Sequence, residues 1–376
     1  MRIAIPAETD PAERRVAATP ESVKKLKALG ATVVVETGAG LGSRLPDADY
    51  LAVGAEIAPT AKTAVESADV VLKVRRPTAD EAGLMKSGAV VLGILDPFGN
   101  TEALDALAKA GLSCFSMELM PRITRAQSMD VLSSQANLAG YRAIIEAAVE
   151  YDRAFPMMMT AAGTVPAARV FIMGAGVAGL QAIATARRLG AIVTATDVRP
   201  AAKEQVESLG AKFIAVEDDE FRQAETAAGY AKPMSAEYQA KQAALVAEHI
   251  RKQDVVVTTA LIPGRPAPRL VSAEMLASMR PGAVVVDLAV ERGGNVEGAV
   301  PGEVLEVGGV KIVGHLNVAG RLAASSSQLY ARNLYNFLET LVDKKAGALA
   351  IKPDDELVKA TLVTSGGAIV HPSFKA

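Results

Sequence analysis

The sequence predicts an α/β protein with two doubly wound parallel-sheet domains, joined by two long helices and with a cleft between them. Three observations lead to this fold class. Strand-like and helix-like segments alternate over the first 120 residues, and a second alternation of the same kind spans residues 168–315. Two long helical patterns follow these regions, one after each. Alternation of this kind is typical of a mainly parallel sheet covered by helices on both faces.

Composition supports two domains and excludes several classes of protein. A chain of 376 residues is long for one core, and half of its residues are hydrophobic. The net charge of −2 gives no general attraction to nucleic acid or to an anionic membrane. The cysteine Cys114 and the histidines His249, His315 and His371 show no metal-ligand spacing, so we expect no metal site and a reduced, intracellular setting. We expect neither a signal peptide nor a membrane-spanning segment.

The first alternation begins at the amino terminus. A helix is expected over Pro20–Leu29, with Thr19 as its N-cap and Gly30 as its stop. Residues 38–43 imitate a glycine-rich turn, but the last glycine is missing and no amphipathic helix follows, so we expect a loop. The expected strands are Arg2–Ile5, Thr32–Glu36, Val70–Val74, Ala89–Leu95 and Leu112–Ser116.

The second alternation lies between the two long helical patterns. One pattern runs from about Asp130 to Tyr151, and the other from about Ser327 to Val342 with N-cap candidates at Ser325–Ser327. The expected strands are Ala168–Met173, Ile192–Thr196, Lys212–Val216, Asp254–Thr259, Ala283–Leu288 and Lys311–Gly314.

The carboxyl-terminal tail is expected to return to the first domain. The segments Thr361–Thr364 and Ala368–His371, separated by two glycines, suggest a hairpin there. We therefore expect the first domain to comprise residues 1–130 plus 328–376, and the second to comprise residues 131–327.

Residues 168–197 contain the most specific pattern in the chain. An apolar run leads into Gly174-Ala175-Gly176-Val177-Ala178-Gly179, and a helix-like segment and a second apolar run ending at Asp197 follow. This is the dinucleotide-binding fingerprint in its strand, turn, helix and strand context, and it predicts Rossmann-like domains. Gly174 permits the tight turn, Gly176 the approach of a pyrophosphate, and Gly179 the close packing of helix on sheet.

Asp197 bears on which nucleotide binds. It lies 18 residues past Gly179, where a carboxylate accepts hydrogen bonds from the adenosine ribose of NAD and repels the 2′-phosphate of NADP. Arg199 favours the opposite choice, NADP, since an arginine at that position is able to bind the 2′-phosphate. We favour NAD(H). Val177, Ala178, Val198, Arg199 and Leu261 complete the expected nucleotide-binding residues.

A polar segment precedes the first long helical pattern. It contains Arg122, Gln127, Asp130, Ser133 and Ser134 within thirteen positions. Gln127, Asp130 and Ser134 share the i, i+3, i+7 spacing that places them on one helical face. Amide, guanidinium and carboxylate groups suit the amide, phosphates and hydroxyls of a nicotinamide nucleotide. The alternative is an ordinary helix N-terminus with capping and solvated groups.

The chain offers little for acid–base catalysis. Oxidation of an alcohol or an amino acid needs a group that takes a proton, most often His or Lys. There is no histidine in the first 248 residues, and Lys73 is the one attractive candidate. Hydride transfer between two nicotinamides needs no such base.

A long insertion separates two strands of the second domain. Residues 217–253 contain a helix-like pattern over Ser235–Arg251, whereas residues 217–234 are polar and lack periodicity. Connections of this length are usually lids or binding loops, so we expect Tyr230 to be presented on a mobile loop. The alternative is a solvated surface loop with an incidental tyrosine.

These segments together resemble one family over essentially the whole chain. MELMPRITRAQSMDVLSSQANLAGYRA, GAGVAGLQAIATARRLGA, AETAAGYAKPM, TTALIPGRPAP and VVVDLAVERGGN look like the NAD(H)-binding component of proton-translocating nicotinamide nucleotide transhydrogenase. The resemblance implies hydride donation from NADH to NADP⁺ held by a partner NADP(H)-binding component. That partner and a membrane domain couple the transfer to proton movement. It also implies a homodimer, cytoplasmic and peripheral on the inner face of the membrane.

The resemblance assigns roles to particular residues. It places Arg122, Gln127, Asp130 and Ser133 on the nicotinamide side. Asp197 matches the ribose carboxylate of the family, and Tyr230 matches its mobile-loop tyrosine.

Two alternatives remain. Alanine dehydrogenase shares the fold, and Arg15 and Lys73 match its substrate-binding pair, whereas its histidine is missing from residues 92–97 and its aspartate is Glu291 here. The missing histidine argues against amino-acid oxidation. The second alternative is a non-catalytic NAD-sensing module that acts through a partner.

Overall fold

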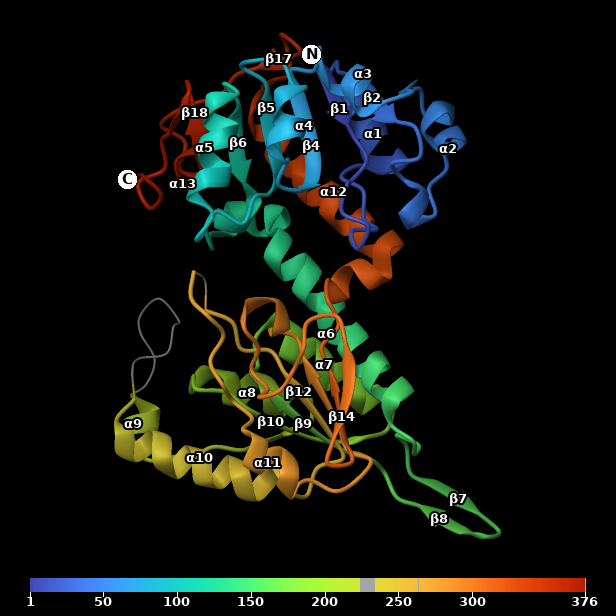
Figure 1. The fold of residues 1–376 in the computed structure, drawn as a ribbon, viewed down its shortest axis with the longest axis vertical. Coiled ribbons are helices and arrows are strands. Elements are labelled where there is room, and N and C mark those ends of the chain that lie inside the picture. Colours follow the sequence, from blue (N-terminus) through green and yellow to red (C-terminus); the bar gives the residue numbers. More distant parts are fainter. Residues whose placement is uncertain (224–233, 263, 376) are drawn as a thin grey trace. The chain divides into compact units, whose positions relative to one another are not determined.

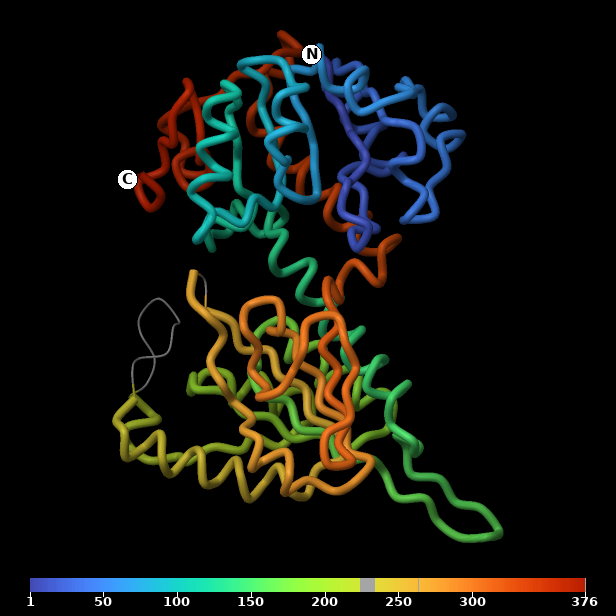
Figure 2. The backbone as a smooth tube through the Cα atoms, viewed as in Figure 1, coloured from blue at the N-terminus to red at the C-terminus, as the bar shows by residue number. Residues whose placement is uncertain are grey.

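The computed structural model describes residues 1–223, 234–262 and 264–375 (Figures 1 and 2). The chain divides into two compact units. Unit 1 comprises Met1–Gln135 and Ala319–Ala376, and unit 2 comprises Ala136–Val318. The chain therefore leaves unit 1 once and returns to it, and each unit is described by itself below.

Unit 1 is built on a mainly parallel sheet with the strand order β19-β18-β6-β5-β4-β1-β2-β3. Strand β18 pairs with β6 in the antiparallel sense, so the carboxyl-terminal hairpin extends the sheet formed by the first 120 residues. The strands are β1 Arg2–Ile5, β2 Thr32–Glu36, β3 Glu56–Ala58, β4 Val70–Arg75, β5 Val90–Ile94, β6 Ser113–Ser116, β18 Leu362–Ser365 and β19 Ala368–Ile369.

Helices cover both faces of this sheet (Figure 1). Ile3 and Ile5 of β1 pack in one apolar cluster with α1 and α12, whereas Ala4 packs in another with α3 and α5. This alternation is the period-two pattern of a strand buried on both sides. The helices are α1 Pro20–Ala28, α2 Asp47–Ala52, α3 Ala61–Val65, α4 Ala79–Gly83, α5 Thr101–Lys109, α12 Ala323–Thr340 and α13 Glu356–Thr361. Between α12 and α13, β16 (Val342–Asp343) pairs with β17 (Ala348–Leu349).

Local signals in the sequence explain the ends of α1. The Thr19 side chain accepts a hydrogen bond from the Ser22 backbone N–H, and Ser22 bonds back to Thr19, which forms a capping box. Gly30 follows the helix with a φ of 83°, a conformation in which glycine costs little. Residues 38–43 form turns and the short 3₁₀ helix η1 (Leu41–Ser43), so the expected loop is confirmed.

Unit 2 has the strand order β11-β10-β9-β12-β13-β15-β14, and only β14 is antiparallel to its neighbour in this sheet. Strand order reverses on either side of β9, which is where ligands bind in sheets of this kind. The strands are β9 Arg169–Met173, β10 Ile192–Thr196, β11 Lys212–Phe213, β12 Val255–Thr258, β13 Val284–Asp287, β14 Val304–Val307 and β15 Val310–Val313.

The helices of unit 2 also lie on both faces of its sheet. Side chains of α6 and α7 share one apolar cluster with Val170 and Ile172, whereas α10 and α11 share the other with Phe171 and Met173. A hairpin of β7 (Met158–Thr160) and β8 (Gly163–Val165) projects from this unit (Figure 1). The helices are α6 Val131–Glu150, α7 Val177–Arg188, α8 Ala201–Ser208, α9 Asp219–Arg222, α10 Ala236–Ile250 and α11 Ala273–Ser278.

Two expected boundaries were wrong. The strand expected over Lys212–Val216 ends at Phe213, and the Val216 N–H is bound by the side-chain oxygen of Gln242 at 2.9 Å. Helix α12 begins at Ala323 rather than near Ser327, and its N-cap is Leu322. The expected capping serines are inside the helix, where Ser327 Oγ bonds the Val16 N–H at 2.9 Å.

Candidate dinucleotide-binding site

The glycine-rich turn lies between β9 and α7 in unit 2. Gly174 has a φ of 107°, and a Cβ there would lie 2.5 Å from Thr259 Oγ1. A Cβ at Gly179 would lie 1.8 Å from the carbonyl oxygen of Gly174. Gly176 differs, since a Cβ there would meet no described atom within 4 Å. The two outer glycines are therefore required by packing, whereas Gly176 borders open space.

That open space suits an anionic ligand. Gly176 is the N-cap of α7 and supplies no side-chain cap, so the first N–H groups of the helix lack a side-chain acceptor. Free N–H groups at the positive end of a helix dipole bind phosphate oxygens. The residues of the turn thus fit a pyrophosphate.

Asp197 follows β10 and reaches back to the glycine turn. Its Oδ2 accepts the Ala175 N–H at 2.7 Å, and its Oδ1 accepts the Arg199 N–H at 2.9 Å. The Arg199 guanidinium binds the same carboxylate through Nε at 2.9 Å and Nη2 at 3.1 Å. The arginine that was the candidate 2′-phosphate ligand is therefore paired with Asp197. A carboxylate has about four lone-pair sites, and these four hydrogen bonds use them, so a ribose hydroxyl would bind Asp197 only by replacing one of them, for example a bond from the Arg199 guanidinium.

Exposed apolar side chains follow the same strand ends. Val177, Val198, Leu261 and Ile262 are 40–54% exposed. They lie beyond the carboxyl ends of β9, β10 and β12, which are adjacent parallel strands. Large exposed apolar groups that gather at one edge are typical of a ligand site, here one with the flat faces of adenine or nicotinamide. Ala178 lies in the first turn of α7.

The polar segment before α6 belongs to unit 1, and the expectation that one helix carries it was wrong. Gln127 lies in the 3₁₀ helix η3 (Thr124–Met129), and α6 begins only at Val131. Asp130 separates η3 from α6 because its carboxylate caps α6. It accepts hydrogen bonds from the Ser133 N–H at 2.9 Å and from the Ser133 hydroxyl at 2.5 Å. The structure thus brings Asp130 and Ser133 together, as an N-cap requires.

The other residues of this segment point in different directions. Gln127 and Arg122 are exposed. The Ser134 hydroxyl donates to Asn333 Oδ1 of α12 at 2.7 Å, so Ser134 joins the first residues of α6, which belong to unit 1, to α12. Tyr230, the expected loop tyrosine, lies outside the described residues.

Unit 1 contains a buried cluster of charges at the carboxyl ends of its strands. Arg15 is 4% exposed, and its guanidinium binds both carboxylate oxygens of Glu13 (Nε–Oε1 2.8 Å, Nη2–Oε2 2.6 Å). Its remaining nitrogen, Nη1, donates to Gln135 Oε1 at 2.8 Å. Burial alone would raise the pKa of Glu13, but hydrogen bonds and charge from Arg15, together with Arg75, lower it to about 2.

Lys73 is held in a similar way. It is 1% exposed, and its Nζ lies 2.6 Å from Glu81 Oε1 and 3.4 Å from Glu8 Oε2. Burial raises the pKa of Glu8 despite the nearby ammonium. Residues 92–97, where alanine dehydrogenase has its histidine, contain none here, and Asp96 in this stretch has a φ of 48°. Both cations that matched a substrate-binding pair are therefore bound to carboxylates of the chain itself.

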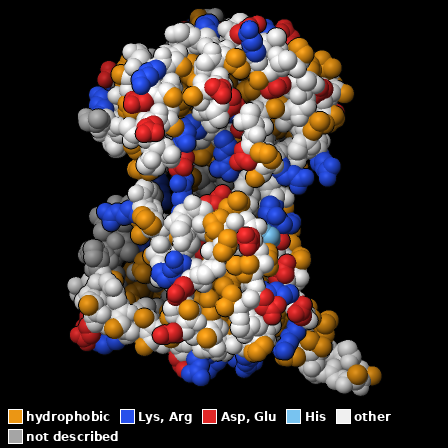
Figure 3. Space-filling model, in the orientation of Figure 1, with side chains coloured by type: hydrophobic (Ala, Val, Ile, Leu, Met, Phe, Trp, Pro, Cys, Tyr) orange, Lys and Arg blue, Asp and Glu red, His pale blue; other side chains and the backbone are white. Residues whose placement is uncertain are grey.

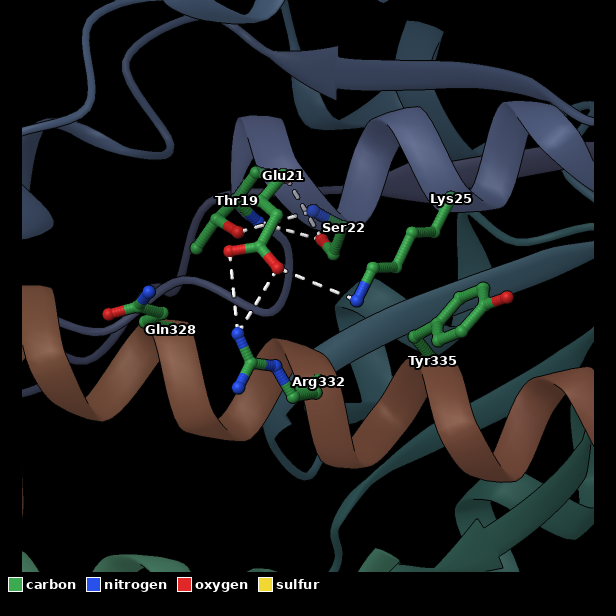
Figure 4. Close-up of a pocket in the computed structure, with 7 residues that line it drawn as sticks. All are labelled: Thr19, Glu21, Ser22, Lys25, Gln328, Arg332 and Tyr335. Atoms are coloured by element: carbon green, nitrogen blue, oxygen red, sulfur yellow. Dashed lines mark hydrogen bonds and ion pairs between the residues drawn. The ribbon is translucent and has the colours of Figure 1, made fainter. Parts of the chain in front are cut away.

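A shallow groove in unit 1 has a different character (Figure 4). It lies between α1 and α12 and encloses only about 10 Å³, the space of a single water. Glu21 of α1 faces Arg332 Nη2 of α12 at 3.1 Å across it, and Lys25 Nζ, one turn further along α1, at 3.4 Å. These are exposed ion pairs, and they do not form a ligand site.

Sequence reasoning missed Thr259 and Asn295. The Thr259 hydroxyl donates to the Gly174 carbonyl at 3.1 Å, and Asn295 binds the neighbouring Ala260. The position of Thr259 at the end of an expected strand was the available signal. Within the described residues, we find no cluster of three or more potential metal-binding side chains. Likewise, none of the helices in the described ranges has the length and apolar character needed to cross a membrane.

The glycine turn, the acid after β10 and the strand order of unit 2 define a dinucleotide-binding protein of the Rossmann-like α/β class. The chain belongs to the alanine dehydrogenase/PNT family. Residues 4–139 match the family described as "Alanine dehydrogenase/PNT, N-terminal domain", and residues 143–372 match "Alanine dehydrogenase/PNT, C-terminal domain".

Individual relatives agree with this assignment. The chain is 57% identical over 379 residues to the first part of NAD(P) transhydrogenase subunit alpha from Rhodospirillum rubrum, covering 100% of this chain and 99% of the relative. A crystal structure of transhydrogenase from Sinorhizobium meliloti is 69% identical, with a TM-score of 0.91 over 98% of this chain and 100% of that chain. An L-alanine dehydrogenase structure is more distant, at 27% identity and a TM-score of 0.83, covering 100% of this chain and 98% of that one.

Proposed function

We propose that this chain is the NAD(H)-binding subunit of a proton-translocating transhydrogenase and passes hydride from NADH directly to NADP⁺ on a partner component. The observation that carries the proposal is Asp197, whose carboxylate is fixed beside the glycine turn by Ala175 and Arg199. A fixed carboxylate at this position favours the free 2′-hydroxyl of NADH over the 2′-phosphate of NADPH. The similarity to transhydrogenase alpha subunits supports the same role.

The surroundings of Lys73 support transfer between nicotinamides rather than oxidation of an amino acid. A catalytic base must reach the proton that it removes, and Lys73 is buried and bound by Glu81 and Glu8. Residues 92–97 contain no histidine. Hydride transfer from one nicotinamide C4 to another protonates no heteroatom, so this chain needs no base for it.

We assign the nicotinamide side to the polar segment of unit 1. Gln127 presents an exposed amide that is able both to donate and to accept, which suits the carboxamide of the ring. Arg122 would bind anionic oxygens, and the Asp130–Ser133 pair would bind hydroxyls while it caps α6. Tyr230 is assigned to the loop that covers the bound nucleotide, on the strength of the resemblance alone.

The proposed partners are the NADP(H)-binding component, a membrane domain and a second copy of this chain. Figure 3 shows hydrophobic side chains on the projecting hairpin of unit 2. Met157 and Met159 there are 61% and 80% exposed, and Val149 near the end of α6 is 70% exposed. Apolar groups of this size on a projecting element favour burial in a homodimer. The subunit would be cytoplasmic and reach the inner face of the membrane through its partners.

The test is to mix the purified chain with an NADP(H)-binding component and to measure NADH-dependent reduction of NADP⁺. Steady turnover that needs both proteins supports the proposal. Reduction of pyruvate with ammonia by this chain alone would instead establish an alanine dehydrogenase. Binding of NADH without turnover in the mixture would favour a sensing module.

A further inference from the structure

Asn295 is a buried side chain that joins two loops of unit 2. It is 0% exposed and lies beyond β13, eight positions after Asp287. Its Oδ1 accepts the Ala260 N–H at 3.0 Å, and its Nδ2 donates to the Ala260 carbonyl at 2.9 Å and to the Pro268 carbonyl at 2.8 Å. One amide thus satisfies both backbone groups of Ala260 and closes the base of the loop that ends at Pro268.

Asn295 is itself held in place by the buried carboxylate of Asp287. Asp287 Oδ1 accepts the Ala289 N–H at 2.8 Å, and Oδ2 accepts the Val296 N–H at 3.0 Å. Gly294 has a φ of 76°, and a Cβ there would lie 2.8 Å from Asp287 Oδ2. The backbone on both sides of Asn295 is therefore fixed, and its amide has little freedom to follow a moving loop.

The residue that Asn295 binds is next to the glycine turn. Thr259, immediately before Ala260, donates its N–H to Met173 O at 2.9 Å and its hydroxyl to Gly174 O at 3.1 Å. Immediately after Ala260 come the exposed apolar side chains of Leu261 and Ile262. A continuous series of hydrogen bonds thus connects Asn295 through Ala260 and Thr259 to Gly174.

We propose that Asn295 is a positioning residue of the nucleotide site, which holds Leu261 and Ile262 in their binding positions before the nucleotide arrives. Ordering a free loop costs conformational entropy for each residue that becomes fixed, and that cost would weaken binding. Ala260 offers one N–H donor and one carbonyl acceptor. An amide is required because its oxygen accepts from that N–H while its NH₂ group donates both to the Ala260 carbonyl and to the Pro268 carbonyl. The inference rests on the proposed binding of NADH to unit 2.

The test compares two replacements of a buried amide by a carboxyl group in the full-length chain. Asn295→Asp keeps the shape but turns a carboxylate toward the Ala260 and Pro268 carbonyls. Gln253→Glu is the matched control, because Gln253 is 3% exposed, donates to His249 O at 3.0 Å and precedes the opposite end of β12. At pH 8.5 we expect Asn295→Asp to raise the NADH dissociation constant roughly 10-fold and Gln253→Glu less than about 2-fold.

A second readout uses the protonation of the introduced acid. A neutral aspartic acid has one O–H donor and one free acceptor, so it restores the two bonds to Ala260. The NADH affinity of Asn295→Asp should therefore recover at pH 6, while that of the unmodified chain and of Gln253→Glu changes little. A residue that only stabilised unit 2 would change the unfolding temperature without this recovery of affinity.

If Asn295→Asp fails to fold, Thr259→Val removes the hydroxyl bond to Gly174 at nearly constant volume. It should weaken NADH binding several-fold, whereas Thr194→Val in β10 should not. Equal NADH affinity in Asn295→Asp and Gln253→Glu, or in the two threonine variants, would overturn the inference. Failure of the unmodified chain to bind NADH would instead overturn the proposed function.

Discussion

The carboxyl ends of the parallel strands differ between the two units. In unit 2 the turn after β9 borders open space at Gly176, and no side chain caps α7. In unit 1, by contrast, buried carboxylates accept hydrogen bonds from the backbone N–H groups at the strand ends. Glu8 accepts the Val74 N–H at 2.7 Å, and Glu118 accepts the Asp96 N–H at 2.6 Å and the Leu95 N–H at 2.8 Å.

The difference teaches that a doubly wound sheet supplies a place for a site but does not make one. Both sheets bring backbone N–H groups to one edge, as parallel strands must. Unit 2 leaves the first N–H groups of α7 without a side-chain cap, whereas unit 1 uses its own glutamates and fills the edge with ion pairs. Burial raises the pKa of Glu8 and Glu118, so the chain accepts an electrostatic cost there. Unit 1 is therefore closed to an anionic substrate at the edge where unit 2 is open.

The largest expected effect is on the stability of the protein, and it comes from breaking the buried Arg15–Glu13 ion pair at the strand ends of unit 1. Arg15→Met removes the bidentate partner of Glu13 and leaves that carboxylate buried beside Arg75 alone. Removing one partner of a buried ion pair costs about 3–5 kcal/mol in the free energy of unfolding. Arg332→Met is the control, because its pair with Glu21 is exposed and worth less than about 1 kcal/mol. Urea unfolding followed by circular dichroism measures both, and equal losses would show that the cluster is not structural.

The pH dependence of stability sharpens the same comparison. Glu13 has a pKa of about 2 in the folded protein, below the value near 4.5 of an unfolded chain. Its contribution, of the order of 3 kcal/mol, is therefore present above pH 4.5 and is lost as the pH falls toward 2. Glu13→Gln should be less stable than the unmodified chain at pH 6, and this difference should shrink as the pH falls. A difference that stays constant between pH 6 and 3 would contradict the prediction.

Much of this architecture could be predicted from the sequence because long apolar strands and capped helices carry local signals. The fingerprint around Gly174 and the acid after β10 were identifiable for the same reason. The strand β3 and the hairpin strands β7 and β8 have three residues each, which is too short for a periodic pattern. Helix α6 begins close to the expected residue, but it does not extend back to Gln127, because the side chain of Asp130 caps it.

The non-local part of the candidate site could not be predicted. Asn295 binds Ala260 from 35 positions away, and Arg15 binds Gln135 from 120 positions away. Sequence spacing alone contains no information on such pairs. The pairing of Arg199 with Asp197 was equally hidden, because the same arginine would suit a 2′-phosphate if it were free.

A smaller effect, on NADH affinity, is expected from a substitution at Asp197 in unit 2. Asp197→Ala removes the proposed acceptor for the ribose and also the acceptor for the Ala175 N–H. It should weaken NADH binding by about 1–3 kcal/mol, the cost of leaving hydroxyl groups unpaired. It also releases Arg199, so the preference for NADH over NADPH should narrow. Calorimetry with both nucleotides measures this, and Asp254→Ala, which removes the acceptor for the Arg169 N–H at the opposite end of β9, is the control. Equal affinity of the unmodified chain for the two nucleotides would end the assignment.

Gln127 is an exposed residue of unit 1. A substitution there should have the smallest effect on NADH affinity but a clear effect on the rate of hydride transfer. Gln127→Asn shortens the side chain by one methylene and moves the amide by about 1 Å. Hydride transfer should slow by on the order of 10–10²-fold with little change in NADH affinity, because misplacement is costly only at the reacting centre.

The pH profile of single-turnover transfer completes this test. No group of the chain has to titrate for hydride to move between two nicotinamides, so the rate should be nearly flat from roughly pH 6 to 9 in both Gln127→Asn and the unmodified chain. Gln328→Asn, a change of the same size beside the groove of α1 and α12, should leave the rate unchanged. A bell-shaped profile would indicate acid–base catalysis. The proposal that hydride moves without a base would then be wrong.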